Sequence, residues 1–316
     1  MDNYLTYLYL LTPLHTGASA NEGNLMGIAR EVHTEFPYMP ASSVRGRIRA
    51  AMEQKHENDD LKETVQIFFG QKIQAGGQPT EGEVWFADAT LLFFPIASLS
   101  HHLVWITCPL WLDRWSRWLG NDQEQIQSLI KDCQEKLREK AAITTFKAEP
   151  LYLQTALLKA GDIDSSIDLE FLEKRIAATV EDSNIFGQIE KKLVIVNNED
   201  CVSLVETGLQ REVRVALNEN EKTVKEGSFR SEEAIPPETI LFFPWAVKPT
   251  CPFSPKPGMK PEDIEKAKSE YKTKSKNRDL LEKSLGILLR DRLQFGGLEG
   301  LGRGWSSLKT DDTKTN

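Results

Sequence analysis

The densest concentration of glycine in this sequence lies in segment 293–305, Leu-Gln-Phe-Gly-Gly-Leu-Glu-Gly-Leu-Gly-Arg-Gly-Trp, which we call the glycine segment. Glycine adopts positive φ angles and lets a backbone approach another molecule with no intervening Cβ. Turns that are rich in free N–H groups bind anions. We therefore predict that a phosphate backbone passes over this segment, with a flexible terminal turn as the alternative. The residues predicted to contact it are Gly296, Gly297, Gly300, Gly302 and Arg303.

Two familiar nucleotide-binding motifs do not fit the glycine segment. A dinucleotide fingerprint needs a strand before the glycines and a helix after them. Here the leucines of 279–293 recur at helical spacing, and the few residues between Trp305 and the polar tail 309–316 are too short for a crossover helix. A P-loop needs Gly-Lys-Ser/Thr, and Gly302-Arg303-Gly304 has neither the lysine nor the hydroxyl.

Residues near the N-terminus offer two further kinds of chemistry. His15 and His33 flank a glycine-punctuated loop and have the side chains of a general acid and base for RNA. The carboxylates Glu22 and Glu31 could hold Mg²⁺ against a phosphate. No H-E-x-x-H, G-x-S-x-G or D-x-D motif accompanies them, and the four cysteines are too far apart to suggest a zinc site or a disulfide framework. No cofactor is therefore certain. His56 is expected on a helix surface.

A helix that begins after Pro40 would position the basic residues. Ser42 or Ser43 suits its N-cap, and Val44 and Ile48 begin a buried stripe. Arg45 and Arg49 are four residues apart and so share one face. Near a helix start, their charge adds to the helix dipole and favours phosphate. The alternative is a solvated charged face.

Apolar runs predict strands at 4–12, 83–95, 101–109, 193–196, 211–217 and 240–247. Trp111, Trp115 and Trp118 recur on one helical face, where core packing is favoured over base stacking, and 122–140 continues as a polar helix. The polar segment 218–238 suits a projecting finger. Segment 248–278 reads as an insertion with a helix beginning near Pro261, and its lysines between 260 and 276 are expected to be solvated.

Composition describes an ordinary soluble globular protein of 316 residues, with one large domain or two. No run of eighteen apolar residues predicts a membrane span, and Asp2, rather than a basic residue, precedes the apolar start. A cytoplasmic location and no membrane partner are expected. The net charge of −8 and pI near 5.4 argue against nonspecific nucleic-acid binding. A nucleic-acid surface would have to be local.

Several stretches, in this order, resemble one known family. They are Pro-Leu-His-Thr-Gly at 13–17, Arg30-Glu31, Phe-Pro-Tyr-Met-Pro-Ala-Ser-Ser-Val-Arg-Gly-Arg-Ile-Arg at 36–49, and the stretches 87–99, 104–109, 226–241 and 296–304. Together they resemble the RAMP superfamily of CRISPR proteins, and within it the backbone subunits of type III-B (Cmr) effector complexes. The resemblance covers most of the chain and is weakest over 248–278.

The resemblance implies an α+β fold, a modified RNA-recognition-motif (ferredoxin-like) core with helical insertions and a projecting β-thumb. It divides one domain, 1–316, into a glycine loop and basic helix (13–55), a helical insertion (110–192), a thumb hairpin (211–241) and an insertion (248–278). In this family several copies stack head to tail along a CRISPR guide RNA (crRNA), and each thumb interrupts the guide–target duplex. The implied partners are guide RNA, target RNA, other copies of the chain and other Cmr subunits.

The resemblance also implies roles for individual residues. Phe229 or Ile235, beside Arg230, would wedge a base step. The remaining predicted RNA-binding residues are His15, Gly17, Arg30, Ser42, Ser43, Arg45 and Arg49.

The departure from the family lies in the first loop. Family members cut target RNA with a divalent metal and an aspartate five residues before the arginine of a Pro-x-x-Arg motif. In this chain that position is Leu25, and Gly27 replaces the proline. We expect target slicing to be lost or weakened. The alternatives are slicing with Mg²⁺ through Glu22 or Asn24, metal-independent crRNA processing through His15 and His33, and a metabolic enzyme with a phosphate site, for which no motif was found.

Overall fold

The computed structural model describes residues 3–17, 25–71, 80–147, 149–154, 156–177, 179–180, 183–216, 218, 223–225, 227–249, 251–255 and 257–315. Glu22 and Asn24 lie outside these ranges. The strands are β1 (Asn3–Leu10), β2 (Leu25–Met26), β3 (Val84–Phe86), β4 (Thr90–Ser98), β5 (His102–Thr107), β6 (Ala142–Thr144), β7 (Leu151–Leu153), β8 (Ala156–Leu158), β9 (Ile163–Asp164), β10 (Leu193–Val196), β11 (Gln210–Arg214), β12 (Arg230–Ala234), β13 (Ile240–Val247), β14 (Arg292–Gln294) and β15 (Trp305–Thr315).

The α-helices are α1 (Ala41–Lys55), α2 (Lys62–Phe68), α3 (Pro109–Ser116), α4 (Gln123–Lys136), α5 (Glu170–Ile176), α6 (Ser183–Lys191), α7 (Asn198–Gly208) and α8 (Pro261–Leu288). Short 3-10 turns lie at η1 (Gly120–Asp122), η2 (Ala160–Asp162) and η3 (Glu299–Leu301).

Ten strands of the described chain form one large sheet, in the order β14-β15-β1-β13-β4-β5-β10-β6-β9, with β3 paired to β13. β1 is antiparallel to both of its neighbours, β15 and β13. Strands from the two ends of the chain therefore lie side by side within the sheet. A second sheet has the order β11-β12-β2, and a third pairs β7 with β8.

Apolar side chains cover both faces of the large sheet. Along β1, Leu8 and Leu10 enter one core, which α1, α7 and α8 share, while Tyr7 and Tyr9 enter another, which α3 to α6 share. This division follows from the two-residue period of a strand, which sends successive side chains to opposite faces. A strand that is buried on both faces needs a continuous apolar run, as the sequence has from residue 4 to 11.

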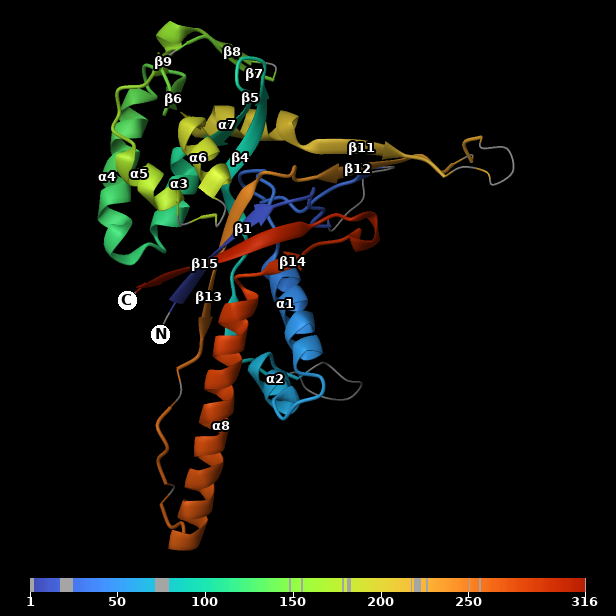
Figure 1. The fold of residues 1–316 in the computed structure, drawn as a ribbon, viewed down its shortest axis with the longest axis vertical. Coiled ribbons are helices and arrows are strands. Elements are labelled where there is room, and N and C mark those ends of the chain that lie inside the picture. The colour runs from blue at the N-terminus through green and yellow to red at the C-terminus, as the bar shows by residue number, and fades with distance from the viewer. Residues whose placement is uncertain are drawn as a thin grey trace.

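Two projections leave this layered body (Figure 1). The hairpin of β11 and β12, which we call the thumb, extends to the right in the view, and the long helix α8, which we call the arm, extends downward. The helices α3 to α6 lie together at the upper left, and the two termini lie close to each other. The predicted region 211–241 covers the thumb apart from Gln210, the first residue of β11, and its last residues, Ile240 and Leu241, belong to the buried strand β13.

Several predicted strands differ from the structure. The predicted strand 83–95 is two strands, β3 and β4, because Ala89 turns aside to bridge Met39 and the Asp88 carboxylate accepts a hydrogen bond from the Ala41 N–H (2.6 Å). The predicted polar tail 309–316 is largely part of β15, which pairs with β1. The helical insertion 110–192 also contributes β6 and β9 to the large sheet. Strands 193–196 and 240–247 are confirmed as β10 and β13.

Some helical predictions also change. Neither Ser42 nor Ser43 caps α1, which begins at Ala41, after Pro40. His56 is buried rather than exposed, and its ring bonds Asp59 and the Ser284 hydroxyl of α8 (2.7 and 2.9 Å). The predicted helices near Pro261 and over 279–293 are one continuous arm.

Core packing of the tryptophans is confirmed for Trp111 and Trp115, which are fully buried. Trp118 lies beyond the end of α3 and is partly buried against the same core as Trp115. Among the described helices, none has an apolar stretch long enough to cross a membrane.

Candidate nucleic-acid interface

A groove of about 420 Å³ separates α1 from the glycine segment. Three separate pieces of chain meet there, because β1 and β15 are neighbours and carry their loops to the same edge. Its lining comprises Thr16, Gly17, Ser43, Gly46, Arg47, Ala50, Gly296, Gly297 and Glu299. Apart from Arg47 and Glu299, these side chains are small, so much of the groove surface is backbone.

One flank of α1 forms a wall of this groove. Ser43, Gly46, Arg47 and Ala50 follow the i, i+3, i+4, i+7 spacing of a single helix face. A Cβ on Gly46 would meet no atom within 4 Å, so packing does not require glycine there. Glycine inside a helix costs about 1 kcal/mol relative to alanine. The fold therefore does not require glycine at this position, and its missing side chain leaves this wall of the groove open.

Arg47 is the cation of the groove. Its Nε donates a hydrogen bond to the Gln294 carbonyl (2.8 Å), which orients the guanidinium beside the glycine segment. Arg47 is not among the residues predicted from the sequence. The available signal was the neighbouring glycine at position 46, because glycine is unfavourable in the middle of a helix and here marks the flank that lines the groove.

The predicted pair Arg45 and Arg49 lies on the other flank of α1. Arg45 donates to the Phe69 carbonyl beside α2, and burial, followed by repulsion from Arg49, lowers its pKa. Arg49 pairs with Glu53 (2.9 Å). These two arginines therefore bind the protein itself, and neither lines the groove. Of the predicted serines, Ser43 lines it, whereas Ser42 is exposed and does not.

The glycines of the glycine segment have different roles. Gly304, at φ +81°, would place a Cβ 1.8 Å from the Phe295 carbonyl oxygen, and Gly296, at φ +79°, would place one 2.4 Å from that of His15. These two are required by packing. Gly300 and Gly302 face open space, although Gly302 also has positive φ. Gly297 donates its N–H to the His15 carbonyl (2.8 Å) and lines the groove.

His15 connects the pieces that surround the groove. Its ring is buried, and Nδ1 donates to the Glu233 carbonyl of the thumb (2.8 Å), while its own carbonyl accepts from Gly297. His33 lies in a different environment, since it is exposed in the turn after Arg30. The burial of His15 argues against its predicted role as a surface RNA ligand and against catalysis shared with His33.

The base of the thumb is held by ion pairs on both faces of β12. Successive side chains of a strand point to opposite faces. On one face, Oε2 of the buried Glu232 lies 3.3 Å from Nη2 of Arg303 and 2.9 Å from Nε of Arg214. On the other, the buried Glu233 lies 2.9 Å from Arg30.

Two predicted phosphate ligands are therefore already paired. Arg303 is 4% exposed and also contacts Glu212 (2.9 Å). Arg30 also contacts Glu206 (2.7 Å); burial by itself lowers the pKa of Arg30, but the two carboxylates raise it above its usual value. In this structure both arginines attach the thumb to the loops around it, and neither presents its charge to a ligand.

The outer part of the thumb carries exposed apolar side chains. Phe229 is 51% exposed and Val213 59% exposed, and Arg230 is exposed beside Phe229. Ile235 is fully buried and bridges Leu14, so it cannot wedge a base in this conformation. Phe229 thus stays a candidate for base contact, whereas Ile235 belongs to the core.

The first loop enters the thumb sheet at the position where the family has its aspartate. Leu25 lies in β2 and pairs with Ser231 of β12. Its side chain has no oxygen with which to bind a metal. Glu31, the other predicted carboxylate, forms a two-pronged pair with Arg114 (2.7 and 2.9 Å). Within the described ranges, no three His, Cys, Asp or Glu side chains cluster as metal ligands would. These residues do not fit a divalent cation.

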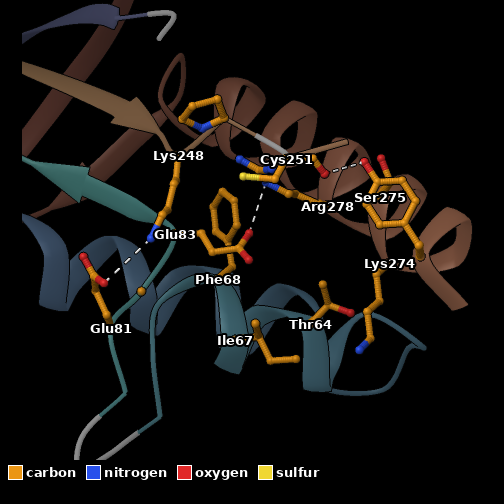
Figure 2. Close-up of a pocket in the computed structure, with 13 residues that line it drawn as sticks. Thr64, Ile67, Phe68, Glu81, Glu83, Lys248, Cys251, Lys274, Ser275 and Arg278 are labelled. Atoms are coloured by element: carbon orange, nitrogen blue, oxygen red, sulfur yellow. Dashed lines mark hydrogen bonds and ion pairs between the residues drawn. The ribbon is translucent and has the colours of Figure 1, made fainter. Parts of the chain in front are cut away.

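A second cleft, of about 490 Å³, lies at the root of the arm (Figure 2). It is lined from α2, the 81–83 segment, the 248–251 segment and α8. Two of its cations are paired, Lys248 with Glu81 (3.8 Å) and Arg278 with Glu83 (3.1 Å), as the dashed lines in Figure 2 show. The third cation of its lining is Lys274, and the cleft is separate from the groove described above.

These features define a class of protein: an α+β domain with a groove lined mostly by small residues and a hairpin that projects from the same body. The family model of the RAMP superfamily matches residues 7–308, and the chain belongs to that superfamily. A similar relative is the CRISPR system Cmr endoribonuclease Cmr4 of Pyrococcus furiosus, which is 25% identical over 322 residues, covering 100% of this chain and 98% of the relative.

Solved structures show the same fold. Oligomeric Cmr4 from Pyrococcus furiosus, in its crystal structure, aligns with a TM-score of 0.62 at 22% identity, covering 98% of each chain. A chain of the type III-B Cmr-beta complex bound to cognate target RNA aligns with a TM-score of 0.67 at 17% identity, covering 98% of this chain and 97% of that one. The predicted α+β fold and the resemblance to this family are confirmed.

Proposed function

We propose that this chain is a backbone subunit of a type III-B CRISPR effector. It binds guide RNA along the groove between α1 and the glycine segment, and several copies stack along one guide with other Cmr subunits. The thumb helps to bind target RNA. The similarity to Cmr4 over the full length of both chains supports this function, as does the Cmr-beta neighbour bound to target RNA. A cytoplasmic location stays a prediction.

The observation that carries this proposal is the open groove wall at Gly46 and Arg47. A linear polyanion needs a continuous path and a few positive contacts, and most protein hydrogen bonds to a nucleic-acid backbone go to phosphate and sugar without reading the bases. Backbone that is free of bulky side chains provides the path, and Arg47 provides a charge. A narrow site of this kind is compatible with a chain of net charge −8.

The two flanks of α1 allow a direct test. Arg47→Gln should weaken guide binding and make the slope of log K against log salt concentration shallower by about 0.7, the value for one phosphate of a single strand. Arg49→Gln removes the same charge from the other flank and is the control, expected to leave the slope unchanged. Filter binding over a salt series measures both. Equal effects of the two variants would contradict the assignment of guide binding to the Arg47 flank, and a larger effect of Arg49→Gln would place it on the Arg45–Arg49 flank.

We further propose that target slicing is lost or weakened in this chain. Leu25 occupies the position of the family's aspartate and supplies no ligand for a metal or water. Assembled with guide RNA and complementary target in Mg²⁺, the chain should give no regularly spaced cuts, whereas Leu25→Asp should gain them. Robust cuts by the unaltered chain would overturn this proposal.

The name of the Pyrococcus relative, an endoribonuclease, favours one second candidate: an active slicer that uses Glu22 or Asn24. If the unaltered chain cuts target RNA and Glu22→Ala abolishes the cuts, this candidate is correct. The metal-independent alternative through His15 and His33 predicts cleavage of repeat RNA by the isolated chain in EDTA.

A further inference from the structure

The arm carries a concentration of positive charge that the groove does not use. Residues 266–278 contain six basic side chains and one acidic side chain, a net charge of +5 within a chain of net charge −8. The rest of the protein therefore has a net charge of −13. Over the whole of α8 the seven basic side chains exceed the six acidic ones by only one, so the positive charge belongs to this middle stretch, where it raises the local potential.

Five of the six cations are free. Lys266, Lys268, Lys272, Lys274 and Lys276 each have no ion pair or hydrogen-bond partner among the residues that the structure describes. In Figure 2, Lys274 extends toward α2 without a dashed partner. The sixth, Arg278, is held by Glu83. Within the described ranges, these five lysines therefore form no ion pair.

Three of the lysines form a row that opposes folding of the helix. Lys268, Lys272 and Lys276 are spaced i, i+4, i+8 and so lie along one face, about 6 Å apart at 1.5 Å rise per residue. Like charges at i, i+4 each destabilise a helix by a few tenths of a kcal/mol. The buried residues of α8, Leu281, Ser284 and Leu285, lie nearer its C-terminal end, so packing does not explain the row.

We propose that this lysine row binds the phosphates of single-stranded RNA outside the guide groove. The inference rests on the proposed function in one respect, because the assembly of the chain on guide RNA is what binds the second RNA. A protein partner fits less well, because lysine is depleted at protein–protein interface cores and the neighbouring Ser269 and Thr273 are exposed and polar. The His56–Ser284 hydrogen bond joins the arm to α1, so the arm is held to the groove helix.

The test uses the full chain assembled on guide RNA and a labelled oligouridine that cannot pair with the guide. Binding is measured by fluorescence anisotropy over a salt series. The triple variant Lys268→Gln, Lys272→Gln, Lys276→Gln should make the salt slope shallower by about 2, which is about 0.7 per lysine on a single strand. Lys272→Gln alone should account for about a third of that change. The control triple replaces Lys131, Lys159 and Lys191, which lie outside the arm, and should leave the slope unchanged.

Each outcome is decisive. Removing like-charge repulsion should not unfold the arm, and circular dichroism of the variants verifies this. If the arm triple binds oligouridine with the slope of the control, or if the unaltered particle does not bind it, the proposal is overturned. If the arm triple keeps its slope but loses copy-to-copy association, the row belongs to a protein interface instead. Guide binding by the unaltered chain is measured separately. If the chain does not bind guide RNA, the proposed function is wrong.

Discussion

Gly46 is a glycine that neither its helix nor its packing requires. The residue lies inside α1, where alanine would give a more stable helix, and a Cβ there would touch nothing. Gly304 is the opposite case, since its Cβ would overlap the Phe295 carbonyl. The fold itself requires the second glycine but not the first, and under the proposed function the first one leaves room for the guide strand.

Gly46→Ala should therefore separate stability from RNA binding. We expect the free energy of unfolding to rise by up to about 1 kcal/mol, because alanine favours the helix, while guide affinity falls because the new methyl group enters the groove. Gly187→Ala, in α6, also faces open space and should stabilise the chain without affecting RNA. Urea unfolding and guide binding measure the two effects. Unchanged guide affinity for Gly46→Ala would contradict the groove assignment.

Glu238 provides a prediction about pH from one side chain. Burial raises the pKa of its carboxyl, so ionisation opposes folding. The stability linked to this group is fully present below the ordinary glutamate pKa of about 4.3, and part of it is lost as pH rises through the raised pKa of the folded chain. Glu238→Gln keeps an acceptor for the Tyr9 hydroxyl and should raise the melting temperature at pH 7 but not at pH 4. Equal shifts at both pH values would exclude this explanation.

At the scale of elements, β12 couples two loops that are remote in sequence. Its two faces bind the glycine segment through Arg303 and the first loop through Arg30, and its edge pairs with β2. The orientation of the thumb is therefore tied both to the groove and to the position of Leu25. A change at the base of the thumb should therefore alter both the groove and the position of Leu25.

Arg303→Met tests this coupling. Breaking a buried ion pair costs roughly 3–5 kcal/mol, and because Glu232 keeps Arg214 as a partner we expect about 3 kcal/mol of lost stability. Arg214→Met is the control; that side chain is 37% exposed, so its loss should cost about 1 kcal/mol or less. Urea unfolding gives the costs, and hydrogen exchange in β11 and β12 should rise selectively in Arg303→Met. If the two variants lose similar amounts of stability and show similar hydrogen exchange, Arg303 does not hold the thumb in place.

For the whole molecule, the distribution of charge matters more than its sum. A net charge of −8 disfavours indiscriminate binding to nucleic acid, while the middle of the arm, residues 266–278, concentrates positive charge and the groove contributes the single cation Arg47 beside Glu299. Copies that share one guide are held by it at high effective concentration, which strengthens weak contacts between neighbours. Assembly should therefore depend on RNA.

Light scattering coupled to size exclusion tests assembly. On guides of increasing length, the mass of the complex should increase in steps of one chain, 35.8 kDa, because each added copy needs its own length of RNA. RNase treatment should return the complex to the mass of a single chain. A single fixed mass at every guide length would instead favour the metabolic-enzyme alternative.

The sequence alone was sufficient for features that depend on local periodicity. The buried stripe of α1, the strands β10 and β13 and the burial of Trp111 and Trp115 all follow from the spacing of apolar residues, since burial of one face is what such spacing encodes. The position of the thumb followed from the family resemblance and from a polar segment between two apolar strands.

Only the tertiary structure decided which charged groups are free. Periodicity shows which face of α1 is buried, but the two flanks beside that face are equivalent in sequence, so Arg47 could not be preferred over Arg45 and Arg49. Arg30 and Arg303 look available in the sequence because their partners, Glu233 and Glu232, are 203 and 71 residues away. Contacts between such distant residues arise only when the sheet brings β12 between the first loop and the glycine segment.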